Sequence, residues 1–232
     1  MKTIGLIGGM SWESASEYYR IINQRVKERL GGLHSAQCIL YSVDFQEIEK
    51  LQHQDEWEEL TRLMIQFAEK LEDAGAELIV ICTNTMHKMA DEVENSVTIP
   101  LVHIADATGK AIVEKGLKKL ALLGTRFTME EDFYKKRLEE RYNIEVLIPP
   151  ETDRKAIDDV IYHELCLGII KQSSKEKLKK IIKALALNGA EGVILGCTEI
   201  PLLISQEDVE IPLFDTTKIH AESAVEMALG KG

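Results

Sequence analysis

Two short polar segments of the sequence carry side chains suited to proton transfer, and each directly follows an apolar run. The first is Cys-Thr-Asn-Thr at residues 82–85, and the second is Gly-Cys-Thr-Glu at residues 196–199. A cysteine thiol titrates at roughly pH 8.5 in peptides, and lower beside amide dipoles or a cation. Amides that follow a strand end can bind a carboxylate at a helix N-terminus. These residue types therefore indicate acid–base chemistry on a small substrate that carries a carboxylate.

An internal repeat relates the two polar segments to each other. Three matches occur in order and nearly in phase, pairing residues 2–8 with 118–124, 75–81 with 189–195, and 98–101 with 210–213. Matches in this order predict two homologous halves. Extending the middle match without a gap places Thr83 opposite Cys197. Two equivalent strand ends could then address opposite faces of one substrate, with a proton leaving one face and returning to the other.

Short apolar runs alternate with longer amphipathic runs along the whole chain. Residues 3–7 and 38–43 are typical of buried strands, whereas 14–30 and 56–74 carry apolar side chains at helical spacing and are followed by glycine. This alternation is typical of parallel sheets covered by helices. The predicted fold is α/β, with two similar small domains, each a parallel sheet flanked by helices, and the active site in the cleft between them.

Composition argues against several classes of protein. The 232 residues are 45% apolar and 29% charged, which favours a globular chain over a disordered one. A net charge of −11 argues against nucleic acid as a partner, and no apolar run approaches the roughly 18 residues of a membrane span. The first residues lack a signal-peptide pattern. Because the four cysteines form no CxxC pair, we expect reduced thiols in the cytoplasm.

Three motifs in these segments resemble those of the aspartate/glutamate racemase family, the cofactor-independent amino-acid racemases. They are Gly-Gly-Met at 8–10, Asn-Thr-Met-His at 84–87 and Gly-Cys-Thr-Glu-Ile at 196–200. The resemblance covers essentially the whole chain. It implies a first domain of residues 1–102 and 214–232, a second domain of residues 103–213, and a homodimer that needs neither pyridoxal phosphate nor a metal. Glu199 follows the aspartate-racemase branch, because the glutamate-racemase branch usually has histidine there.

One departure from the family pattern concerns the residue before Asn-Thr, which is usually cysteine. This chain has Thr83 there, with Cys82 displaced by one position. Since a shift of one residue turns a strand side chain to the opposite face, we expect Cys82 to pack with Leu78 and Val80. Thr83 then points into the cleft. The predicted catalytic pair is Thr83 and Cys197, with the thiol abstracting the α-hydrogen from one enantiomer and the hydroxyl delivering a proton to the opposite face.

The remaining predicted site residues bind substrate. Hydroxyl and amide donors near the pair suit the α-carboxylate of the substrate. Met10 closes over the substrate, and the family resemblance implies that Gln52 touches it. The predicted substrate-binding residues are Met10, Gln52, Asn84, Thr85, Thr198 and Glu199. Some have a structural alternative: Asn84 and Thr85 could cap a helix, as Asn and Thr after a strand often do, and Met10 could simply pack. His87 could tune the site or serve structure alone, and six scattered histidines lack metal-ligand spacing.

Cysteine is more often a small core residue than a nucleophile, which is our expectation for Cys38 and Cys166. Racemisation of aspartate or glutamate is the leading interpretation of the whole pattern. A decarboxylase or cis–trans isomerase of the same superfamily is an alternative, because only one thiol of the pair is present. A two-lobed amino-acid-binding protein is a second alternative, against which the thiol at the cleft and the lack of an export signal argue.

Overall fold

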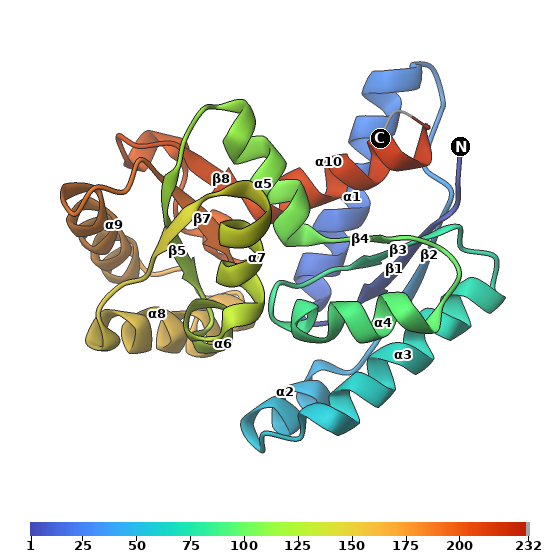
Figure 1. The fold of residues 1–232 in the computed structure, drawn as a ribbon, viewed down its shortest axis with the longest axis horizontal. Coiled ribbons are helices and arrows are strands. Elements are labelled where there is room, and N and C mark those ends of the chain that lie inside the picture. Colours follow the sequence, from blue (N-terminus) through green and yellow to red (C-terminus); the bar gives the residue numbers. More distant parts are fainter. Residues whose placement is uncertain (231–232) are drawn as a thin grey trace. The chain divides into compact units, whose positions relative to one another are not determined.

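The computed structural model describes residues 1–230 of the chain, which fold into two compact units (Figure 1). Unit 1 consists of Met1–His103 together with the residues from His220 on, and unit 2 consists of Ile104–Ile219. The predicted first domain included residues 214–219, which the structure instead assigns to unit 2. The reason is that Leu213–Asp215 forms a strand of the unit 2 sheet.

Unit 1 contains a four-stranded parallel sheet in the order β2-β1-β3-β4. Its strands are β1 (Ile4–Gly8), β2 (Cys38–Ser42), β3 (Leu78–Ile81) and β4 (Leu101–Val102). Its helices are α1 (Trp12–Leu30), α2 (Phe45–His53), α3 (Trp57–Asp73), the 3-10 helix η1 (Thr85–Met89), α4 (Ala90–Ser96) and, from His220 on, α10 (Thr216–Ala228).

Side chains of the unit 1 sheet alternate between two apolar cores. Leu78 and Val80 pack in one core with α1 and α10, whereas Ile79 and Ile81 pack in the other with α2, α3 and α4. Both faces of the strands are therefore covered. This explains why β1 and β3 are buried throughout, as continuous apolar runs in parallel sheets usually are.

Unit 2 repeats this architecture with a parallel sheet in the order β6-β5-β7-β8. The strands are β5 (Lys119–Gly124), β6 (Glu145–Leu147), β7 (Gly192–Gly196) and β8 (Leu213–Asp215). One face packs against α5 (Ile104–Glu114) and α7 (Asp132–Tyr142), and the other against α8 (Glu151–His163) and α9 (Gln172–Leu187). Shorter helices are α6 (Arg126–Glu130), η2 (Leu165–Leu167), η3 (Ile200–Leu202) and η4 (Gln206–Asp208).

The two units share one strand order, in which the first strand of each sheet lies between the second and the third. The three sequence matches fall on β1 with β5, on β3 with β7, and on β4 with β8. The prediction of two similar α/β halves, each a parallel sheet flanked by helices, is therefore confirmed. Within residues 1–230, no helix is both long enough and apolar enough to cross a membrane.

The Gly-Gly pair at the end of β1, residues 8 and 9, allows close packing of the backbone. Gly9 has a φ of +91°, and a Cβ built on it would lie 2.3 Å from the Val43 carbonyl oxygen. The Val43 amide donates a hydrogen bond to the Gly8 carbonyl over 3.0 Å. Only glycine tolerates both the backbone conformation and the contact, so this pair fixes the loop that carries Met10.

Candidate active site

In unit 1, the polar segment 82–85 begins where β3 ends. The last ladder pair of β1 and β3 joins Ile7 to Ile81, and the Cys82 amide still donates to the Ile7 carbonyl over 2.9 Å. The next amide, that of Thr83, turns back to the Ile81 carbonyl, also over 2.9 Å. Thr83 is thus the first residue beyond the ladder and is positioned by the turn.

Cys82 and Thr83 have different surroundings, as the alternation of strand side chains predicts. The Cys82 side chain is fully buried in the apolar core that contains Leu78 and Val80. Burial without a charged partner raises the pKa of its thiol strongly, because the thiolate would be desolvated. Thr83 is only partly buried. Of the two, Thr83 is the residue that solvent and a small ligand can reach.

The other predicted residues of unit 1 belong to η1 or are linked to it through Met86. Asn84 and Thr85 are both buried and open the 3-10 helix η1. Gln52, on α2, donates from Nε2 to the Met86 sulfur over 3.2 Å, and Met10 belongs to the same apolar core as Met86. The structure therefore brings Gln52 to the segment that follows β3, although the two are far apart in sequence.

The amide oxygen of Gln52 is a candidate ligand-binding atom. Its side chain is 4% exposed, and its Oε1 is buried without a hydrogen-bond partner among the described residues. A buried amide oxygen left unpaired costs about 1–3 kcal/mol. Such an atom is a ready acceptor for an N–H donor supplied by a ligand.

In unit 2, Cys197 follows β7 and is 7% exposed. Its thiol donates a hydrogen bond to Glu199 Oε2 over 3.0 Å. The Thr198 hydroxyl donates to the same carboxylate oxygen over 2.7 Å. The three consecutive side chains therefore form one cluster, in which a single carboxylate oxygen accepts from both neighbours.

This environment sets the protonation state of the thiol. Burial, and then the negative charge of Glu199, raise the pKa of Cys197 well above its ordinary value. Amide dipoles or a cation beside the sulfur would lower the pKa of a thiol. The group beside the sulfur is instead a carboxylate, so the thiol keeps its proton at neutral pH. That Glu199 is the hydrogen-bond acceptor of the thiol could not be deduced from its spacing alone.

A profile of the Asp/Glu/Hydantoin racemase family matches residues 7–224. The chain belongs to this family. It is 25% identical over 231 residues to the broad specificity amino-acid racemase RacX of Bacillus subtilis (strain 168), and the match covers 96% of both chains.

Two crystal structures are similar to this racemase-family chain over its whole length. One is that of a Yersinia pestis protein provisionally named an Asp/Glu racemase, which is 55% identical with a TM-score of 0.92 and covers 99% of this chain and 100% of that chain. The other is that of an aspartate racemase homologue from Pyrococcus horikoshii OT3, which is 40% identical with a TM-score of 0.85 and the same coverage of 99% and 100%. These matches identify the chain as an isomerase with the racemase fold.

The other two cysteines of this racemase-family chain lie against apolar cores. Cys38 is half-buried beside the core of α1 and α10, and burial raises the pKa of its thiol. Cys166, in η2, is half-buried beside the core that includes Cys197. Both positions fit the packing role that the sequence predicted. Within residues 1–230, no group of His, Cys, Asp or Glu side chains is arranged to hold a metal ion.

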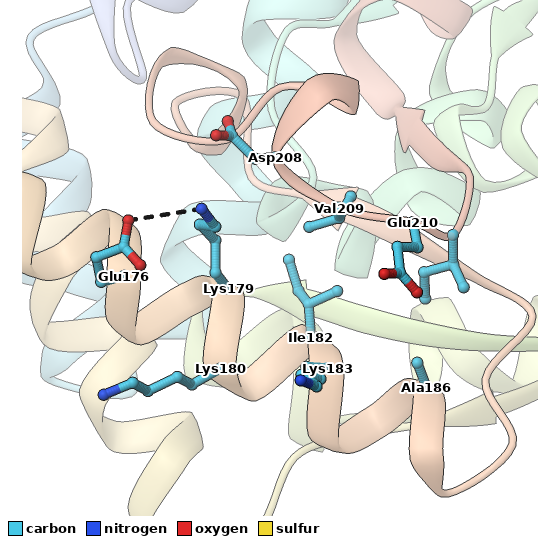
Figure 2. A pocket seen from close by; sticks show the side chains of 10 residues that line it. Glu176, Lys179, Lys180, Ile182, Lys183, Ala186, Asp208, Val209 and Glu210 are labelled. Carbon is cyan, nitrogen blue, oxygen red and sulfur yellow. Dashed lines mark ion pairs between the residues drawn. The ribbon is translucent and has the colours of Figure 1, made fainter.

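A groove on unit 2 is separate from all predicted site residues. It encloses about 300 Å³ between α9 and the segment from η4 to β8. Figure 2 shows Ile182 and Val209 facing each other across it, whereas Lys180 points away. Lys179 pairs with Glu176 over 3.5 Å, and Asp208 pairs with Lys175 over 2.8 Å. These ion pairs at its rim and the absence of Cys197 from its lining make the groove unsuitable as the centre of proton transfer.

Proposed function

We propose that this chain interconverts the L and D forms of an acidic amino acid, aspartate or glutamate, by proton transfer between two side chains. The observation that carries the proposal is the buried Cys197 thiol hydrogen-bonded to Glu199. A thiol beside a proton acceptor suits abstraction of a weakly acidic α-hydrogen. Membership of the racemase family supports the reaction type, and similarity to an aspartate racemase homologue supports the substrate class.

Cys197 and Glu199 act together on one face of the substrate in this proposal. Glu199 takes the thiol proton, and the resulting thiolate takes the α-hydrogen, leaving a carbanion. Because burial, the larger of the two causes, raises the pKa of the thiol, its thiolate is a stronger base than that of an exposed cysteine even when Glu199 holds the proton. This narrows the difference in acidity between the thiol and the α-carbon. The same environment makes the thiolate scarce, and Glu199 provides the direct route by which the thiol proton leaves.

Thr83 supplies the proton on the opposite face. A neutral hydroxyl is a poor base, but it is an adequate acid towards a strongly basic carbanion, which takes the hydroxyl proton and forms the new C–H bond. Water then returns a proton to the Thr83 oxygen, and Glu199 releases the proton it took from the thiol to the hydroxide left behind, so both groups regain their starting states. In the reverse direction, Thr83 must first lose its proton. The two half-reactions therefore pass through groups of unequal acidity.

The substrate is held by polar groups that flank the pair. Asn84 and Thr85, at the start of η1, and Thr198 donate hydrogen bonds to the α-carboxylate. The unpaired Gln52 Oε1 accepts from the α-ammonium group, which satisfies a buried acceptor. Met10 closes over the apolar part of the substrate. The reaction in this form requires neither pyridoxal phosphate nor a metal.

We further propose that the protein is a cytoplasmic homodimer. The four free cysteines suit a reducing compartment. Trp12, Tyr19 and Leu30 lie on one face of α1, at helical spacing, with exposed fractions of 66%, 53% and 44%. Exposed aromatic residues of this kind are frequent at protein–protein interfaces. Light scattering of the purified protein tests the dimer, and Trp12→Lys should shift it towards monomer if α1 forms the interface.

Exchange of the substrate α-hydrogen with deuterium tests the reaction. Each enantiomer of a panel of amino acids is incubated with the protein in deuterated water and followed by proton NMR and circular dichroism. A racemase removes the α-hydrogen signal and the optical activity together. A decarboxylase releases carbon dioxide instead, and a binding protein leaves the signal intact. Turnover of many neutral amino acids would show that specificity is broader than the acidic class.

A further inference from the structure

The three carbonyl groups that directly follow β3 each accept a hydrogen bond from a different donor atom. Ser14 Oγ donates to the Cys82 carbonyl over 2.9 Å. The His87 ring donates from Nδ1 to the Thr83 carbonyl over 2.8 Å, and the His87 amide donates to the Asn84 carbonyl over 3.0 Å. His87 therefore holds two consecutive carbonyls of the turn, and one of them belongs to the proposed proton donor.

The His87 ring has a defined protonation pattern at this contact. A carbonyl oxygen only accepts hydrogen bonds, so Nδ1 of His87 carries the hydrogen. The Thr83 amide bonds to the Ile81 carbonyl, in a turn that the strand ladder does not support. The His87 side chain consequently fixes the Thr83 peptide group on its carbonyl side, where neither a strand nor the main chain of η1 does so.

The orientation of the His87 ring is itself fixed by two other buried histidines. Its ring centre lies 4.7 Å from that of His103 and 5.4 Å from that of His220, both in edge-on geometry. His220 is held in turn, because its Nε2 donates to the Val102 carbonyl over 2.6 Å and its Nδ1 accepts from the Tyr18 hydroxyl over 2.8 Å. His103 and His220 thus hold the His87 ring in place, and rigid packing of this kind preserves the geometry that proton transfer requires.

We infer that His87 is a positioning residue that orients Thr83 for proton transfer. The inference rests on the proposed function, since it assigns His87 a role through the Thr83 hydroxyl. Without the Nδ1 contact, the Thr83 peptide group can rotate, and the hydroxyl leaves the position from which it reaches the substrate. Misplacement of a reacting group by about 1 Å can lower a rate on the order of 10²-fold. The face served by Cys197 keeps its own geometry, because the thiol and Glu199 belong to unit 2.

Three substitutions at one position separate positioning from packing. His87→Leu removes the donor while keeping an apolar side chain. His87→Asn places an amide N–H the same number of bonds from the backbone as Nδ1, and His87→Gln places it one bond further. For each variant, racemisation and α-hydrogen exchange in deuterated water are measured with both enantiomers, and folding is checked by circular dichroism.

The expected result is a selective defect. His87→Leu should lose racemisation on the order of 10²-fold, while exchange by Cys197 without inversion stays near the wild-type rate. His87→Asn should recover much of the racemisation, and His87→Gln should not. Equal losses of racemisation and exchange in folded His87→Leu would overturn the inference. If His87→Leu does not fold, equal activities of the Asn and Gln variants would overturn it instead.

Thr83→Ala, measured in the same assay, distinguishes failure of the positioning role of His87 from failure of the proposed two-base racemisation. If Thr83→Ala racemises normally, then Thr83 is not the second acid–base group, and the two-base proposal fails. If Thr83→Ala loses racemisation but keeps exchange while His87→Leu behaves as wild type, the proposed function stands and only the role of His87 is refuted.

Discussion

Acidification should destabilise unit 1 through His220. The side chain is fully buried, and burial lowers the pKa of the imidazole from 6.5 to about 4. In the unfolded chain the imidazole regains its ordinary pKa. Between these two values the unfolded state binds more protons than the folded state, so the free energy of unfolding falls as the pH drops below about 6.5 and levels off below about 4.

The size of the effect follows from the two pKa values. A pKa difference of about 2.5 corresponds to about 3.4 kcal/mol when both states are fully titrated. At pH 5 the same relation gives about 2 kcal/mol, and at pH 7 only about 0.2 kcal/mol. Since a domain is usually stable by about 5–15 kcal/mol, a loss of this size is readily measured.

Urea unfolding of the wild type and of His220→Gln, at pH 7 and at pH 5, measures this contribution. Glutamine can keep the donor to the Val102 carbonyl but cannot titrate. Relative to wild type, the variant should therefore gain about 2 kcal/mol between the two pH values. His34→Gln, at an exposed position, is the matched control and should follow wild type. A wild type and His220→Gln that lose stability in parallel would show that His220 is not the buried titrating group.

Four further outcomes are expected. Cys197→Ser should lose activity on the order of 10²-fold or more, whereas Cys82→Ala should keep substantial turnover because the Cys82 side chain lies in the core. If both folded variants lost activity equally, Cys82 would have to be a reacting thiol. Thr83→Cys should make kcat for the two enantiomers more nearly equal, while kcat/KM stays the same in both directions because free enantiomers have equal energies. Glu199→Gln should lower the pKa of Cys197, which the pH dependence of thiol alkylation measures. The same variant should slow α-hydrogen exchange, because the proton acceptor is lost. An unchanged pH dependence of alkylation would contradict the contact between Cys197 and Glu199. Protein dialysed against a chelator should keep full turnover and show no pyridoxal absorbance, and activity that returns only with added metal or pyridoxal phosphate would refute the mechanism.

Much of the fold follows from local sequence patterns. The helices α1 and α3 end at Leu30 and Asp73, within one residue of the predicted ends, because glycines shortly after them stop the helical pattern. The internal repeat identified equivalent strands, and strand alternation gave the correct face for Cys82. These inferences succeed because periodicity and glycine act over a few residues.

Contacts between segments that are distant in the chain could not be predicted from the sequence. His87, His103 and His220 come from η1, the end of β4 and α10, and nothing in their spacing shows that they meet. The hydrogen bond from Cys197 to Glu199 joins near neighbours, but the loop conformation decides whether the side chains point together. The raised pKa of the thiol depends on this contact and on burial, so the residue types of the motif could not reveal it.

The split composition of unit 1 has a consequence for how the protein is made. Helix α10 supplies Ala221, Ala224 and Val225 to the core that also contains Leu6 and Val80. A ribosome delivers unit 2, whose residues are consecutive, before it delivers this helix. The nascent chain therefore carries a sheet on which one apolar face is covered by α1 alone until α10 emerges. Chains that terminate before α10 keep part of that face exposed, and exposed apolar surface makes a partly folded chain prone to aggregation.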